Sequence, residues 1–211
     1  MLLTVVDYGV GNLRSIAKSI EKANSDSNLN YSVKVSSDVS DVKKSDKIVL
    51  PGQGSFKACK AGINHIDGLQ EELNENILVK KKPIYGICAG MQLFATIGYE
   101  EEKTEGLNWI KGEVIKLDLN LSKLKIPHMG WNELKVENTS NVFKEVNNKD
   151  HAYFIHSYEF IPKDKKNVSL TTSYGKAVIA AVSLENIYGS QFHPEKSQNT
   201  GIQILANFLN L

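Results

Sequence analysis

One stretch decides the fold: Lys82-Pro83-Ile84-Tyr85-Gly86-Ile87-Cys88-Ala89-Gly90-Met91-Gln92-Leu93-Phe94-Ala95. Residues 82–87 are typical of a buried strand and residues 91–95 of a helix, so Cys88 falls at a sharp turn between them. Small residues flank the cysteine, which is the layout of a nucleophile elbow. A sulfur at the start of a helix is favoured as thiolate by the helix dipole and free N–H groups, which can also stabilise an oxyanion. The stretch therefore predicts a cysteine nucleophile with half an oxyanion hole.

A thiolate nucleophile needs a base, and one of the five histidines is well placed to be that base. His193 precedes Pro194, and a residue before proline is pushed towards an extended conformation. In an extended segment, residues two apart project from the same side, so Glu195 is expected beside the His193 ring. The sequence therefore predicts a triad in which Cys88 is the nucleophile, His193 the base and Glu195 the group that orients it.

Composition bounds the class of protein. The 211 residues are 41% hydrophobic and 23% charged, which suits one globular domain over residues 1–211. A formal net charge of +1 argues against a nucleic-acid partner, and the longest apolar runs are too short to cross a membrane.

The two cysteines and the N-terminus bear on compartment and metal binding. Cys59 and Cys88 offer no zinc spacing and no disulfide framework, so no metal and a reducing cytoplasm are expected. The N-terminal residues are typical of a first strand and not of a signal peptide. Gly9-Val10-Gly11 lacks the third glycine of a dinucleotide-binding loop, so no cofactor is expected.

Strands and helices alternate in the first half. Strands are predicted at residues 2–6, 31–35, 47–50 and 84–87, with helices around residues 13–20 and 69–77. Such alternation indicates an α/β fold whose open, mostly parallel sheet has helices on both faces. Ligands of such sheets bind beyond the carboxyl ends of the strands, where the elbow lies.

The second half changes character. Strands are predicted at residues 109–117, 132–137, 152–160, 168–174 and 176–182, with turns at Gly175 and residues 186–189. Few helices separate these strands, so we expect an antiparallel extension of the sheet. A closing amphipathic helix is predicted at residues 202–209.

Further motifs carry a family resemblance. Besides the elbow and the His-Pro-Glu segment, these are Asp7-Tyr8-Gly9-Val10-Gly11-Asn12-Leu13, Pro127-His128-Met129-Gly130-Trp131-Asn132 and Tyr153-Phe154-Ile155-His156-Ser157-Tyr158. Together they resemble the class I, triad-type glutamine amidotransferases, and within these the glutaminase subunits of imidazole glycerol phosphate synthase. The resemblance spans the chain in order and implies a flavodoxin-like amidotransferase fold.

The resemblance implies the chemistry and the residues around it. Glutamine is hydrolysed to glutamate and ammonia through a thioester, with the backbone N–H groups of Ala89 and Gln53 as the oxyanion hole. Substrate contacts are implied for a further set of residues: Gly52, Gly54, Gln92, Glu100, Ser157 and Tyr158. Ala89 and Gln53 depart from the Leu and Val that are usual in the family.

Free ammonia would diffuse away, so the resemblance also implies an acceptor enzyme as partner. This is a cyclase subunit with a (β/α)8 barrel, in a heterodimer that makes imidazole glycerol phosphate and AICAR for histidine biosynthesis. Asn12, Tyr153 and Lys196 match interface positions of the family. Two alternatives stay open at this point: a paralogous glutaminase that serves another synthase, such as one that amidates a surface sugar, and a cysteine peptidase of similar fold.

Overall fold

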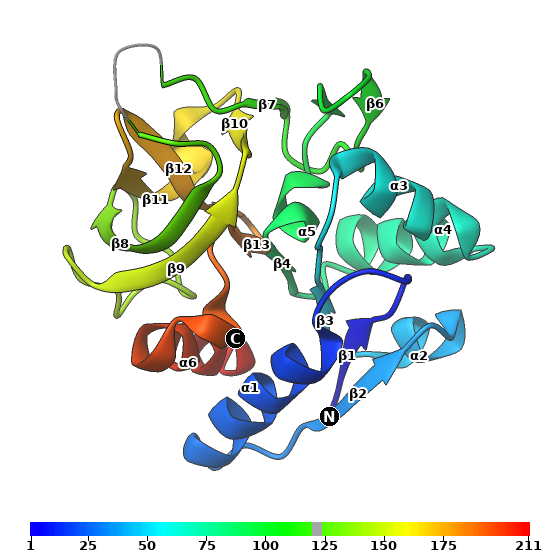
Figure 1. The fold of residues 1–211 in the computed structure, drawn as a ribbon. Coiled ribbons are helices and arrows are strands. Elements are labelled where there is room, and N and C mark those ends of the chain that lie inside the picture. The colour runs from blue at the N-terminus through cyan, green and yellow to red at the C-terminus, as the bar shows by residue number, and fades with distance from the viewer. Residues whose placement is uncertain (120–123) are drawn as a thin grey trace.

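The strand that leads into the elbow lies near the centre of the nine-stranded main sheet. The structure, a computed structural model, describes residues 1–119 and 124–211. Five strands run parallel, in the order β2 (Ser32–Ser36), β1 (Leu2–Val6), β3 (Lys47–Leu50), β4 (Ile84–Ile87) and β13 (Ile187–Ser190). This order is that of flavodoxin-like sheets, in which ligands bind at the carboxyl ends of the strands. The expected α/β fold is confirmed (Figure 1).

Strand β13 corrects the prediction of a turn at residues 186–189. The turn lies only at Glu185 and Asn186, where Glu185 has a φ of 52°. Asn186 stabilises it by donating side-chain hydrogen bonds to the carbonyls of Ile77 and Lys82. The residues that follow form a fully buried strand that pairs with β4. Gly189 does not prevent this, because a glycine within a strand also allows close packing.

The second half continues the main sheet in antiparallel fashion, as expected. Next to β13 follow β12 (Ala177–Leu184), β11 (Val168–Ser173), β8 (His128–Val136) and β9 (His151–His156). A smaller sheet contains β10 (Tyr158–Pro162), β7 (Gly112–Lys116), β5 (Ile97–Gly98) and β6 (Thr104–Glu105). The single strand predicted at residues 152–160 is therefore wrong: it divides at Ser157 between the two sheets.

Helices cover both faces of the parallel strands, as the alternation predicts. One face holds α1 (Leu13–Asp26) and the closing helix α6 (Gln198–Leu209). The other holds α2 (Val39–Lys44), α3 (Phe56–His65), α4 (Leu69–Asn74), the π-helix η1 (Glu75–Val79) and the short α5 (Ala89–Gln92). Two 3-10 turns complete the chain, η2 (Lys165–Asn167) and η3 (Pro194–Lys196). None of the helices in the described residues is long and apolar enough to span a bilayer.

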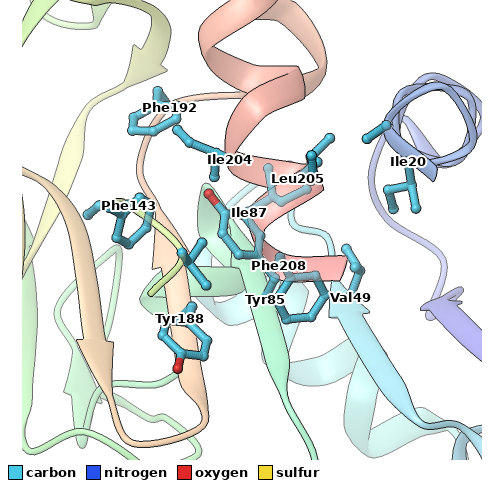
Figure 2. Packing of buried hydrophobic residues seen from close by; sticks show 14 of the residues in the cluster. Ile20, Val49, Tyr85, Ile87, Phe143, Tyr188, Phe192, Ile204, Leu205 and Phe208 are labelled. Atoms are coloured by element: carbon cyan, nitrogen blue, oxygen red, sulfur yellow. The ribbon is translucent and has the colours of Figure 1, made fainter. Parts of the chain in front are cut away.

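The core beneath the elbow is built from β4, β13 and α6. Figure 2 shows Tyr85 and Ile87 of β4 in the same cluster as Leu205 and Phe208 of α6, with Tyr188 of β13 below. The Tyr85 and Phe208 rings lie 5.6 Å apart, centroid to centroid. Burying one such side chain is worth about 1.5–3 kcal/mol, so the strand that ends at the nucleophile is firmly held.

Candidate active site

The elbow holds Cys88 in a conformation that side chains rarely adopt. Its φ is 53° and its ψ −114°, between the last residue of β4 and the first of α5. The Cys88 N–H donates a hydrogen bond of 2.8 Å to the Ser190 carbonyl at the end of β13. Strain of this kind costs about 1–3 kcal/mol and persists only where the surroundings enforce it. Cys88 thus sits where the prediction placed it, at the carboxyl ends of two buried strands.

The loop after β3 lies directly on the elbow. A Cβ atom on Gly52 would stand 2.1 Å from the Gly90 nitrogen, and one on Gly90 would stand 2.0 Å from the Leu50 carbonyl oxygen. Two backbones can approach this closely only where both residues lack a side chain. This contact brings the loop that carries Gln53 beside Ala89, as the predicted oxyanion hole requires.

His193 and Glu195 stand together beside the sulfur. The Nδ1 atom of His193 lies 2.8 Å from Oε1 of Glu195, and their side chains are 10% and 1% exposed. Glu195 belongs to η3, so the expected extended conformation holds at His193 but not at Glu195. A 3-10 turn brings the carboxylate to the ring instead. The structure therefore brings the three predicted triad residues together by a different local geometry.

The surroundings of His193 favour its charged form. Burial by itself lowers the pKa of His193, but hydrogen bonds to Cys88 and Glu195 and the charges of both raise that pKa to about 10. Because Nδ1 faces the carboxylate, Nε2 is left for the sulfur. This is the arrangement of a thiolate–imidazolium pair.

These groups open into one cavity of about 320 Å³. All the residues predicted for catalysis and substrate binding except Glu195 line it: Gly52, Gln53, Gly54, Cys88, Ala89, Gln92, Glu100, Ser157, Tyr158 and His193. Four other residues complete the lining: Pro127, Ile155, His156 and Lys196. Its size suits a small polar molecule. The described residues contain no group of three or more His, Cys, Asp or Glu side chains that could hold a metal ion.

Comparison with known proteins decides the family. The sequence pattern of the family described as "Glutamine amidotransferase class-I" matches residues 4–211. The chain belongs to the class I glutamine amidotransferases. A relative in Pelagibacter ubique (strain HTCC1062), named "Imidazole glycerol phosphate synthase subunit HisH", is 49% identical over 100% of both chains.

Other relatives extend this result. A protein of the same name from Brucella suis biovar 1 (strain 1330) is 42% identical, over 99% of this chain and 98% of its own. At these identities the chain belongs to the same family as these HisH subunits. A solved structure titled "Crystal structure of glutamine amidotransferase" shares the fold, with a TM-score of 0.73 and 15% identity over 99% of each chain.

The predicted substrate contacts are held by the amidotransferase framework. Gln92 is buried and donates from Nε2 to the Tyr158 carbonyl (3.1 Å) and to Oε1 of Gln191 (2.9 Å). Glu100 accepts a 2.7 Å hydrogen bond on Oε2 from the Phe56 N–H at the start of α3. Ser157 uses its carbonyl to pair with Leu117. The side chains of Gln92 and Glu100 and the backbone of Ser157 are thus held at the cavity wall.

Two of the three predicted interface residues lie together. The Lys196 ammonium stands 5.5 Å from the centroid of the Tyr153 ring, and the Tyr153 ring lies 6.0 Å from that of Trp131. Trp131 is 48% exposed. Asn12 is the N-cap of α1, and its side chain accepts from the Ser15 N–H rather than contacting the other two.

His128 on β8 and His156 on β9 are buried opposite each other, and His156 lines the cavity. The Asn132 amide nitrogen donates to the Ser173 carbonyl and lies 3.1 Å from Nε2 of His128, so that Nε2 must accept. Nδ1 of His128 then donates to Nε2 of His156 over 3.0 Å. Nδ1 of His156 in turn donates to the Tyr158 carbonyl over 2.8 Å. The contacts fix both rings as neutral tautomers.

Two residues at the site were missed by the sequence reasoning. Gln191 donates a hydrogen bond from Nε2 to the Cys88 sulfur at 3.5 Å. It lies two residues before His193, so the same alternation that pointed to Glu195 could have found it.

The second residue is Tyr8. Its hydroxyl donates to the Pro51 carbonyl, in the loop that carries Gln53. No local pattern signals that contact, because β1 and this loop meet only in the fold.

Proposed function

We propose that this chain hydrolyses glutamine with Cys88, His193 and Glu195 as its triad, and that residues 1–211 form a single amidotransferase domain. As a member of the HisH family, it is the glutamine amidotransferase subunit of an imidazole glycerol phosphate synthase. The observation that carries the triad is the strained elbow cysteine beside a buried His–Glu pair. The cytoplasm is the proposed compartment.

The reaction has two halves. The Cys88 thiol gives its proton to Nε2 of His193, and the sulfur attacks the side-chain amide carbon of glutamine. The tetrahedral intermediate collapses as His193 returns the proton to the leaving nitrogen, which releases ammonia and leaves a thioester. Water, deprotonated by His193, then attacks the thioester. The sulfur leaves as the thiolate and glutamate is released, which restores the thiolate–imidazolium pair.

Each tetrahedral intermediate carries an oxyanion. The backbone N–H groups of Ala89 and Gln53 are the proposed donors, and loss of one such donor costs about 100- to 1000-fold in rate. The close contact of Gly52 with Gly90 supports this role, since it sets the loop against the elbow.

Substrate recognition is proposed for the cavity wall around the elbow. Glu100 faces the α-ammonium group of glutamine, while Gly52, Gly54 and the segment Ser157–Tyr158 contact the polar ends of the substrate. Gln92 takes part through its amide oxygen, because its Nε2 atom already donates to two protein acceptors. All of these residues line the one cavity around Cys88.

The ammonia passes to a partner. The subunit names of the relatives imply a synthase complex, and we propose a cyclase subunit with a (β/α)8 barrel, in a heterodimer. The docking face includes Lys196, Tyr153 and Asn12, and exposed Met129 and Trp131 on β8 extend it. Desolvating such apolar side chains is the usual source of interface affinity.

The test is glutamate release from glutamine by the wild type and by Cys88→Ala, each with and without the cyclase and its ligand. We expect strong stimulation of the wild type by the cyclase and no turnover by Cys88→Ala. Turnover by Cys88→Ala would disprove the nucleophile. A wild type that no cyclase stimulates would disprove this partner and leave a different synthase as acceptor.

A further inference from the structure

Gln191 is fully buried beside the nucleophile, in the segment between β13 and His193. Its backbone N–H donates to the Ala180 carbonyl at 2.8 Å, which holds the residue on β12. Its side chain contacts Gln92 on one side and the Cys88 sulfur on the other. A primary amide at a site with no exposure is costly unless its polar atoms are all used. Gln191 is therefore placed for a purpose that packing alone would not require.

A backbone carbonyl fixes the direction of this amide. The Tyr158 carbonyl can only accept, so the atom of Gln92 that faces it must be the nitrogen. The same nitrogen faces Gln191 at 2.9 Å, so Gln191 must present its oxygen there. The Gln191 nitrogen then points to the sulfur, 3.5 Å away. The order of contacts leaves no alternative in which either amide is reversed.

We propose that Gln191 is a further catalytic residue, whose side-chain N–H group stabilises the Cys88 thiolate and fixes its direction of attack. This inference rests on the proposed function, since it assumes that Cys88 is the nucleophile. His193 faces the sulfur as the proton acceptor, and Gln191 adds a donor that never takes the proton. The same N–H stabilises the thiolate again when the sulfur leaves the second tetrahedral intermediate.

A hydrogen bond to a charged acceptor changes the acid–base balance of the sulfur measurably. Its loss is expected to raise the midpoint of the pH profile of Cys88 alkylation by about one unit. The freed thiolate is also the stronger nucleophile, with a Brønsted coefficient of about 0.4–0.5. Relative to wild type, alkylation therefore slows about threefold at low pH and quickens about threefold at high pH. The two profiles cross, which a mere loss of packing does not produce.

The experiment measures alkylation of Cys88 by iodoacetamide against pH, with the labelled peptide quantified by mass spectrometry. Gln191→Met keeps the length of the side chain and removes the donor. Gln191→Glu keeps the shape and, when ionised, sets an acceptor against the sulfur. The midpoint of the pH profile should be lowest in the wild type, higher in Gln191→Met and highest in Gln191→Glu. Identical midpoints in all three would overturn the proposal.

Two controls accompany the measurement. Gln203→Met makes the same chemical change on the exposed side of α6 and should leave the profile of Cys88 unchanged. Cys59 is an internal reference, since burial raises its pKa to about 11 and its labelling should not differ between variants. Circular dichroism confirms folding, and if Gln191→Met does not fold, the near-isosteric Gln191→Glu decides alone.

Glutamate release separates this inference from the proposed function. Turnover that requires Cys88 but is unaffected by either Gln191 variant, with unshifted profiles, refutes the role of Gln191 alone. Shifted profiles without any glutamine hydrolysis refute the proposed function instead. If both hold, kcat falls in Gln191→Met, and a glutamine KM close to that of the wild type shows that the loss lies at the sulfur.

Discussion

Acid should unfold this protein through its two buried histidines. Burial lowers the pKa of His128 and His156 from 6.5 to about 4, with the charge of His128 adding to the effect at His156. In the unfolded chain both rings titrate near the ordinary value. Between pH 4 and 6.5 the unfolded state therefore binds more protons, and the free energy of unfolding falls as the pH falls.

The size of the effect follows from the two pKa values. Going from pH 7 to pH 5 costs about 2 kcal/mol for each ring, or about 4 kcal/mol if both titrate independently. Because the rings contact each other, their titrations are coupled, so this sum is an upper bound. For a chain of this length, the melting temperature should fall by roughly 10 °C. His193 does not produce this loss: its raised pKa gives stability that is fully present below pH 6.5 and lost only as the pH rises towards 10.

The assay is urea unfolding at half-unit intervals between pH 4.5 and 7.5. The double variant His128→Asn/His156→Gln should be less stable than wild type at pH 7 but nearly flat with pH. A control with the exposed residues changed, His65→Gln/His151→Gln, should keep the full wild-type slope. A wild type whose unfolding free energy changes by less than about 1 kcal/mol between pH 7 and 5 would refute the reasoning.

Three further predictions follow from single contacts. Tyr8→Phe removes the donor to the Pro51 carbonyl and should lower kcat about tenfold, since a loosened loop forfeits part of an oxyanion donor; an unchanged kcat would show that the hydroxyl does not hold the loop. Gly90→Ala would set a Cβ 2.0 Å from a backbone oxygen, so this variant should not fold, as circular dichroism would show. Lys47→Met removes hydrogen bonds to the Phe208 and Leu209 carbonyls at the end of α6 and to the backbone oxygen of Leu211 beyond it, and should cost about 1–3 kcal/mol in thermal unfolding; an unchanged melting temperature would mean that water replaces the ammonium group.

The sequence predicted the parallel half of the fold well because local patterns suffice there. Residues 2–6, 47–50 and 84–87 are short apolar runs between turns and helices, and all three are strands in the structure. The antiparallel half was predicted less well. Residues 152–160 are continuous in hydropathy, and only the packing of two separate sheets divides them at Ser157.

Strand β13 illustrates a second limit. The residues 186–189 contain asparagine and glycine, which favour turns, yet three of the four form a buried strand. The neighbouring strand β4 is more than ninety residues away in sequence, and pairing with it outweighs the local preference for a turn. The three triad candidates come from residue types in two local motifs, and the structure brings them together, although the geometry expected at Glu195 was wrong.

Two series of side-chain hydrogen bonds meet at the Tyr158 carbonyl. It accepts from His156, which ends the histidine chain, and from Gln92, which begins the amide chain to Cys88. A carbonyl oxygen has two lone pairs and can satisfy both donors. Because it only accepts, it sets the direction of every hydrogen bond on both sides, including the one at the sulfur. Protonation of His128 would reverse its Nε2 from acceptor to donor and set it against the Asn132 amide. This would disturb the β8–β9 strand pair, which holds His128 opposite His156, the residue that donates to this carbonyl. The acid sensitivity of the fold and the state of the nucleophile should therefore change over the same pH range, with the pH profile of Cys88 alkylation departing from a single titration as unfolding begins.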